Sequence, residues 1–153
     1  MVQPFVPAGF VVPESLEHER FRLEPLGPQH NARDHAAWMS SIDHILATPG
    51  FGEPDFDWPQ AMPLEENLRD LEMHARHFVE RVGFTYSVLD ADEVIGCVYI
   101  YPSSDPFHDA VVRSWVAASR AELDGVLHEV VSVWLRDAWP FSNPSYARRQ
   151  PAS

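Results

Sequence analysis

The sequence predicts a single α+β domain, in which helices and strands share one hydrophobic core. Its 153 residues suit one core, and its 45% hydrophobic and 22% charged residues are the balance of a globular protein. The spacing of apolar side chains also alternates along the chain between the three- or four-residue period of helices and the two-residue period of strands. We therefore treat residues 1–153 as one domain.

Helical spacing covers three long segments. Apolar side chains recur every three or four residues over residues 32–46, 64–81 and 121–138, so each segment is expected to form a helix with one buried stripe. Residues 49–63 lie between the first two helices and are rich in proline and aromatic residues. A loop of this length in a small domain is often functional.

Two-residue alternation predicts four strands, at residues 21–26, 84–89, 94–101 and 110–118. The polar residues 90–93 are few enough to join the middle two strands as a hairpin. The change from helical spacing to alternation after residue 83 therefore marks the start of the main sheet.

Both ends of the chain lack this periodicity. Residues 1–19 and residues 139–153 each contain three prolines and few regularly spaced apolar positions. We expect an extended lead-in at residues 1–19 and a polar tail at residues 139–153, both outside the compact core.

The chain is strongly acidic, with 23 acidic against 11 basic residues and a formal net charge of −12. Such a charge opposes binding to nucleic acids and to anionic membranes, so we expect neither as a partner. The single cysteine, Cys97, excludes an intrachain disulfide. We see no signal peptide and no apolar stretch of about 18 residues, so a cytoplasmic location is expected.

The predicted order of elements is strand, helix, helix, hairpin, strand and helix. Two segments within it are informative: Val94-Ile95-Gly96-Cys97-Val98-Tyr99 in the hairpin, and SWVAASRAELDG at residues 114–125. This order and these segments resemble the GNAT N-acetyltransferase superfamily over most of residues 20–138. The resemblance implies a mixed, mainly antiparallel twisted sheet flanked by helices.

The resemblance also implies a function, that of an acyl-CoA-dependent N-acetyltransferase. Acetyl-CoA would be the cofactor, and a small-molecule amine would attack its thioester directly. The acidic charge of the chain suits a cationic acceptor. The other interpretation is a catalytically silent GNAT-like protein, which acts as a binding or scaffold protein and does not use acetyl-CoA.

The resemblance assigns the cofactor site to one loop. In that family, backbone amides at a helix N-terminus bind the pyrophosphate of the cofactor, within the pattern Gln/Arg-x-x-Gly-x-Gly/Ala. The corresponding pattern here is Arg120-x-x-Leu123-x-Gly125. The cofactor-binding residues implied by this match are Val116, Ala117, Ala118, Arg120 and Gly125.

This loop departs from the family pattern. Leu123 stands where the family has its first glycine, and Glu122 and Asp124 place carboxylates near a polyanionic cofactor. Ser119 and Glu122 also fit a capping box, which would occupy the amides of the helix start. Two hypotheses follow: either the amides bind phosphates, or the cofactor site is degenerate and weak.

The chain is short after its last predicted helix. The family usually continues with a helix and strands, which often supply a tyrosine that protonates the departing thiolate. Only 15 residues follow Ala138, and Tyr146 is the only tyrosine among them. A final strand, if the fold has one, would come from the partner in a homodimer.

Three residues are candidates for catalysis. Tyr99 and Tyr101 share one face of a predicted strand, either in the wall of an acceptor pocket or as packing residues. His44 would act as a base at a pocket rim, or be an exposed histidine near the end of the first helix. Cys97 is expected to be a small buried apolar residue rather than a nucleophile.

We expect a substrate pocket to be lined by three aromatic residues and one arginine: Trp38, Phe51, Trp58 and Arg113. Phe51 and Trp58 belong to the long loop, which could bind a small molecule. An arginine within a strand needs an acidic partner or an anionic ligand, and with so many carboxylates present an internal ion pair is favoured for Arg113.

One further cluster has metal-binding spacing. Asp70, His74 and His77 lie on one side of the second predicted helix, at i, i+4 and i+7. They also flank its apolar stripe, where solvated polar residues are usual. We therefore predict no metal site.

Overall fold

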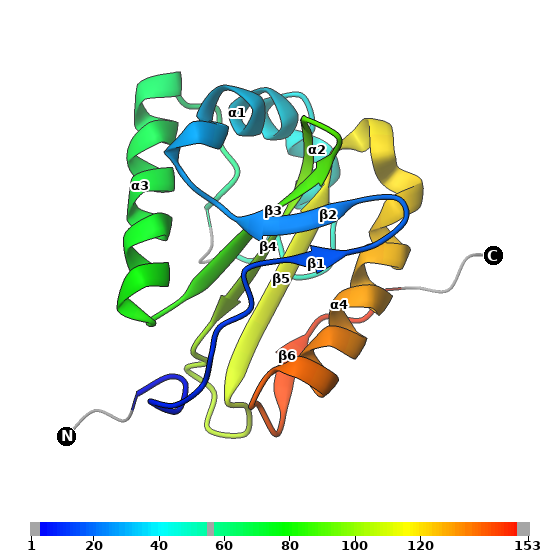
Figure 1. The fold of residues 1–153 in the computed structure, drawn as a ribbon. Helices are drawn as coiled ribbons and strands as arrows, with labels where there is room; N and C mark the ends of the chain where they lie inside the picture. Colours follow the sequence, from blue (N-terminus) through cyan, green and yellow to red (C-terminus); the bar gives the residue numbers. More distant parts are fainter. Residues whose placement is uncertain (1–3, 55–56, 150–153) are drawn as a thin grey trace.

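The computed structural model describes residues 4–54 and 57–149, and it places one curled sheet between two layers of helices (Figure 1). Neighbouring strands from the first to the fifth are antiparallel, and the sixth is parallel to the fifth. The predicted mixed, mainly antiparallel sheet is confirmed. In sheet order, the strands are β1 (Leu16–Glu17), β2 (Arg22–Pro25), β3 (Phe84–Asp90), β4 (Glu93–Tyr101), β5 (Ala110–Val116) and β6 (Pro144–Tyr146).

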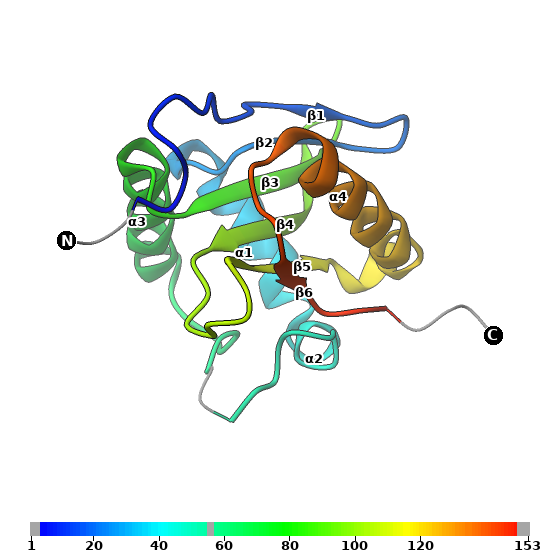
Figure 2. The same cartoon turned by 90° about the horizontal axis from the view of Figure 1, so that it is seen from below.

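Helices cover both faces of this sheet. The first three α-helices lie on one face, and α4 lies alone on the other (Figures 1 and 2). None of the helices within residues 4–54 and 57–149 is long and apolar enough to span a lipid bilayer. The helices are η1 (Pro28–His30), α1 (Asn31–Met39), α2 (Ile42–Leu46), α3 (Leu64–Glu80), η2 (Ala118–Leu123) and α4 (Asp124–Ala138), where η marks a 3₁₀-helix.

The two faces of the sheet carry different cores because side chains alternate along β4 and β5. Val98 and Val112 face α4 and belong to a core that contains Leu127. Cys97 and Trp115 face α1 and belong to a second core. The two-residue period of the sequence therefore determines which side chains of β4 and β5 belong to each core.

The predicted helix over residues 32–46 is in fact two helices. α1 ends at Met39 and α2 begins at Ile42, and Ser41 between them has an extended φ of −134°. The buried hydroxyl of Ser41 accepts a hydrogen bond of 2.8 Å from the amide of Ala118. This bond connects the junction of α1 and α2 to the first residue of η2.

The described residues at both ends of the chain lie against the core, where we had expected them to lie outside it. Val6 is buried, and Phe5 stacks on Phe84 and Phe141, so the lead-in packs on the core. Residues 139–149 also pack, since Trp139 is buried and residues 144–146 form β6. Among the described residues, the final strand of the sheet, β6, therefore comes from this same chain. Aromatic side chains supply enough buried area for these short segments to stay attached.

We predict that Leu127→Ala lowers the free energy of unfolding by about 2–5 kcal/mol. Leu127 is 0% exposed and lies in the core that α4 forms with the sheet, so truncation leaves a cavity. Urea unfolding followed by circular dichroism measures the change. The matched control is Val133→Ala on the same helix, whose side chain is 41% exposed and should cost at most about 0.5 kcal/mol. Equal losses in both variants would show that α4 is not packed as described.

Candidate functional site

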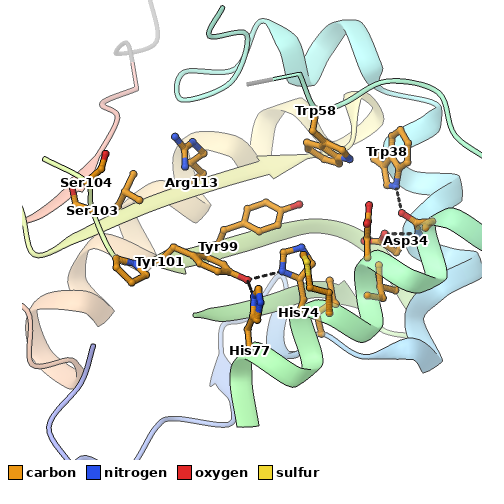
Figure 3. A pocket seen from close by; sticks show the side chains of 17 residues that line it. Asp34, Trp38, Trp58, His74, His77, Tyr99, Tyr101, Ser103, Ser104 and Arg113 are labelled. Carbon is orange, nitrogen blue, oxygen red and sulfur yellow. Dashed lines mark hydrogen bonds between the residues drawn. The ribbon is translucent and has the colours of Figure 1, made fainter. Parts of the chain in front are cut away.

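A cavity of about 600 Å³ opens between α1, α3 and the strands β4 and β5 (Figure 3). It lies on the face of the sheet opposite α4. Its wall combines aromatic rings, carboxylates and histidines. The lining residues are Leu26, Asp34, Trp38, Trp58, Asn67, Asp70, Leu71, Met73, His74, His77, Tyr99, Tyr101, Pro102, Ser103, Ser104, Val111 and Arg113.

A chain of hydrogen bonds joins α1 to α3 at one end of this cavity. The indole nitrogen of Trp38 donates to Asn67 Oδ1 at 3.1 Å, and Asn67 Nδ2 donates to Asp34 Oδ2 at 3.1 Å (Figure 3). Asn67 Nδ2 also donates to Asn31 Oδ1 at 2.9 Å. The amide of Asn67 thus orients the ring of Trp38 and the carboxyl of Asp34 together.

Asp34 is 4% exposed, and burial raises its pKa from 3.8 to about 6. Asp70 on α3 adds to this rise, while the hydrogen bond from Asn67 and the nearby His35 oppose it. The pKa of Asp70 is itself raised, first by burial and then by Glu66. The α1–α3 end of the cavity is therefore acidic and poorly solvated.

Aromatic rings form the wall next to Asp34. Trp58 lies 5.4 Å from Trp38, 6.2 Å from Tyr99 and 6.1 Å from Trp115, between ring centroids. Phe51 packs behind it, 5.9 Å from Trp58. These tilted and edge-on contacts are the favourable geometries for aromatic pairs, so the long loop is held against the sheet by its aromatic residues.

A second polar cluster lies along the wall of the cavity. The hydroxyl of Tyr101 is 2.7 Å from His74 Nδ1 and 3.0 Å from His77 Nδ1 (Figure 3). This hydroxyl can donate to one ring nitrogen and accept from the other. Burial, and to a smaller extent the neighbouring His77, lower the pKa of His74 to about 4. His74 is therefore neutral at physiological pH.

The pairing between β5 and β6 is short. It joins Ala110–Val112 to Pro144–Tyr146. Beyond it, the side chain of Arg149 spans the two segments, donating to the carbonyl of Ser114 at 2.9 Å and to Asp124 Oδ2 at 2.7 Å. The hydroxyl of Tyr146 lies 2.5 Å from Ser114 Oγ, and burial raises its pKa to about 12. Beyond Val112, β5 therefore has no strand partner on this side among the described residues. Ser114 instead contacts the side chains of Tyr146 and Arg149.

The structure places the cofactor residues implied by the resemblance around this same region. Val116 ends β5, Ala117 and Ala118 lead into η2, and Gly125 is the second residue of α4. A side chain at Gly125 would meet nothing within 4 Å. Arg120 points elsewhere, because its guanidinium is bound by Asp90 at 2.7 Å and Glu93 at 3.0 Å.

The predicted capping box is not formed. The N-caps of η2 and α4 are Ala117 and Leu123, and neither has a side-chain cap. Glu122 instead lies 3.8 Å from Arg20. Leu123, which replaces a glycine of the family pattern, is buried in the core with α4, so its side chain does not cover the amides.

Five of the residues proposed from the sequence meet at the cavity: Trp38, Trp58, Tyr99, Tyr101 and Arg113. Phe51 supports the wall from behind, and His44 lies on α2, outside the lining. Arg113 Nε donates to the carbonyl of Gly50 at 2.9 Å, which ties the long loop to β5.

Four polar lining residues were missed or misjudged: Asp34, Asn67, His74 and His77. Asp34 precedes Trp38 by four residues, and Asn67 precedes Leu71 by four, so each lies on the buried face of its helix. That spacing was the available signal. His74 and His77 were expected to be solvated, yet both contact Tyr101. Among the described residues, no group of three or more His, Cys, Asp or Glu is placed to hold a metal ion.

Comparison with solved structures shows the fold. The chain matches the ribosomal-protein-S5-alanine acetyltransferase from Vibrio fischeri with a TM-score of 0.62 and 20% identity, over 81% of this chain and 68% of that chain. It also matches RimL, a ribosomal L7/L12 alpha-N-protein acetyltransferase, with a TM-score of 0.60 and 15% identity. This match covers 86% of this chain and 69% of that chain.

A third match is MccE, a microcin C7 self-immunity acetyltransferase in complex with acetyl-CoA and AMP. The TM-score is 0.60 at 10% identity, over 78% of this chain and 63% of that chain. No protein-family model and no curated protein sequence matches this chain. The predicted GNAT fold is confirmed by the structural matches.

We predict that Asp34 makes stability depend on pH near 6. Its pKa is higher in the folded chain than in the unfolded chain, so protonation favours folding. This contribution is fully present below pH 3.8 and is lost as the pH rises through about 6. The rise in pKa from 3.8 to about 6 corresponds to about 3 kcal/mol.

Urea unfolding of the wild type and of Asp34→Asn between about pH 4 and about pH 8 measures this effect. The wild type should lose stability relative to the variant as the pH rises. A constant difference between the two proteins across this range would contradict the buried, perturbed state of Asp34.

Proposed function

We propose that this chain, which has the fold of the GNAT acetyltransferases, is an acyl-CoA-dependent N-acetyltransferase that transfers an acetyl group directly to an organic amine. One observation carries the proposal: β5 lies between two different chemical environments. Val111 and Arg113 on one face line the cavity, while Ser114 meets Tyr146 and Arg149 beyond the last pair with β6. Two reactants could therefore approach the same strand from different sides.

The start of η2 and α4 fits the phosphates of coenzyme A. Helix-start amides without a side-chain cap bind anions, and the open position of Gly125 lets a phosphate approach. Asp124 is neutralised by Arg149, which removes one of the two repulsive carboxylates. Within this start, the amides of Ala118, Arg120 and Asp124 are already bonded to Ser41 Oγ and to the carbonyls of Ala117 and Ala121, so the phosphates would use the other amides. When bound, acetyl-CoA would supply the thioester acyl group.

On the cavity side, an attacking amine has to lose a proton. The ring of His74 lines the cavity and is neutral at physiological pH, so one of its nitrogens carries no proton and is available to the amine. The hydroxyl of Tyr101 lies 2.7 Å from its Nδ1, and Thr85 Oγ1 lies 3.1 Å from the same atom. These contacts orient the ring, so we assign His74 as the proton acceptor and Tyr101 as the group that positions it.

On the other side of β5, Tyr146 can hold a proton. Its raised pKa keeps the hydroxyl un-ionised at physiological pH, and Ser114 Oγ orients it at 2.5 Å. The resembled family often has a tyrosine that protonates the departing thiolate, and Tyr146 is our candidate for that role. It belongs to β6, the strand that the sequence did not predict.

We predict that acetyl-CoA binds the purified protein saturably with a micromolar dissociation constant, equivalent to about −8 kcal/mol. Isothermal titration calorimetry at low and moderate salt measures this, and affinity should fall with salt because the ligand is anionic. Desulfo-coenzyme A is the control for binding without the thioester. Absence of binding at millimolar cofactor would contradict the proposal and favour a catalytically silent protein.

We predict that His74→Gln lowers kcat/KM for acetyl transfer by about 10²–10⁴-fold, the usual contribution of a general base. Release of coenzyme A with a panel of organic amines is the assay, read with a thiol reagent. Acetyl-CoA affinity should not change, because His74 lies on the cavity side of β5.

Tyr101→Phe separates positioning from proton transfer. It should lower kcat less than His74→Gln and shift the pH profile, because His74 loses an orienting hydroxyl but keeps its ring. Arg76→Gln, an exposed change on the same helix, should leave the rate unaltered. A His74→Gln variant with wild-type kinetics would remove His74 from the reaction.

A further inference from the structure

Asp34 is a buried carboxylate that makes no ion pair with the described residues. Its described hydrogen bond comes from the neutral amide of Asn67, and none of the ion pairs among residues 4–54 and 57–149 involves it. Removing an ionised carboxylate from water is costly unless a positive charge compensates for it. The carboxylate faces the cavity (Figure 3), so a ligand could supply that charge.

The surroundings of Asp34 favour a positive ligand. Asp70 on α3 adds a second acidic group to the same lining. His74 is neutral because its pKa is lowered. The chain contains no lysine, since all 11 of its basic residues are arginine, so no lysine ammonium of its own can fill the position.

The aromatic wall suits the remainder of such a ligand. Trp38 and Trp58 lie next to each other, with centroids 5.4 Å apart, and both line the cavity with Tyr99. A cation over an indole face is attracted by the π-electrons of the ring, and more strongly where water is excluded. Apolar atoms attached to the cation would be buried against the same rings.

From this arrangement, we propose that the cavity binds an organic ammonium compound with an apolar body, whose positive charge pairs with Asp34 beside Trp38 and Trp58. This ligand is the acceptor amine of the acetyltransferase proposed above, and to that extent the inference rests on that function. A volume of about 600 Å³ accommodates a small molecule of this class.

Matched probes test the charge requirement without acetyl-CoA. Phenethylammonium and hexylammonium are titrated into the full-length protein at neutral pH, against phenethyl alcohol and hexanol, which have the same shape and no charge. Calorimetry and tryptophan fluorescence both report binding. Each ammonium should bind at least about tenfold more tightly than its alcohol. Equal affinities, or no binding of either ammonium at about 10 mM, would overturn the proposal.

Asp34→Asn should abolish this preference, leaving ammonium and alcohol with similar affinity. Asp43→Asn is the matched control, because Asp43 is exposed on α2 and the change in net charge is the same. It should keep the wild-type preference. If Asp34→Asn also keeps the preference, Asp34 does not bind the cation. Circular dichroism checks folding, and the wild-type comparison of charged and uncharged probes stands without any variant.

The two proposals fail separately. Ammonium binding with no acetyl-CoA binding would overturn the acetyltransferase and leave the cation site. Acetyl-CoA binding with no preference for ammonium over alcohol would do the reverse.

Discussion

The alternation of side chains along β4 and β5 is the constraint on which the rest of the structure depends. One set of residues, with Val98 and Val112, forms the core under α4, and the other set faces α1 and the cavity. Gly96 allows the two strands to approach, because any Cβ there would collide with the carbonyl of Trp115. A one-residue slip in register would exchange the two faces and remove Tyr99 and Arg113 from the cavity.

The cavity is open because its polar groups are held by one another rather than by tight apolar packing. Asn67 serves as the connection between α1 and α3, with Trp38 and Asp34 as its partners. The arrangement leaves one buried, acidic end and one wall formed by His74, His77 and Tyr101. Such a separation of charge within a cavity is typical of sites that must orient a polar substrate.

The end of the chain completes the other side of β5. Arg149 binds Asp124 and the carbonyl of Ser114, and Tyr146 binds the Ser114 hydroxyl. These contacts attach the last described residues to the start of α4. They also supply an arginine and an un-ionised hydroxyl to a region that contains two acidic residues, Glu122 and Asp124, so the local charge differs from what the linear sequence indicates.

Period and composition in the sequence determined the helices, the hairpin and the faces of Tyr99, Tyr101 and Arg113, because these depend on contacts between near neighbours in the chain. Tertiary structure alone decided the attachment of β6 and the burial of Asp34, because each depends on a partner at least 32 residues away: Tyr146 contacts Ser114, and Asp34 contacts Asn67. The sequence alone does not show whether a carboxylate on a helix is buried, because its burial depends on the helix that packs against it. For Asp34, that burial raises the pKa.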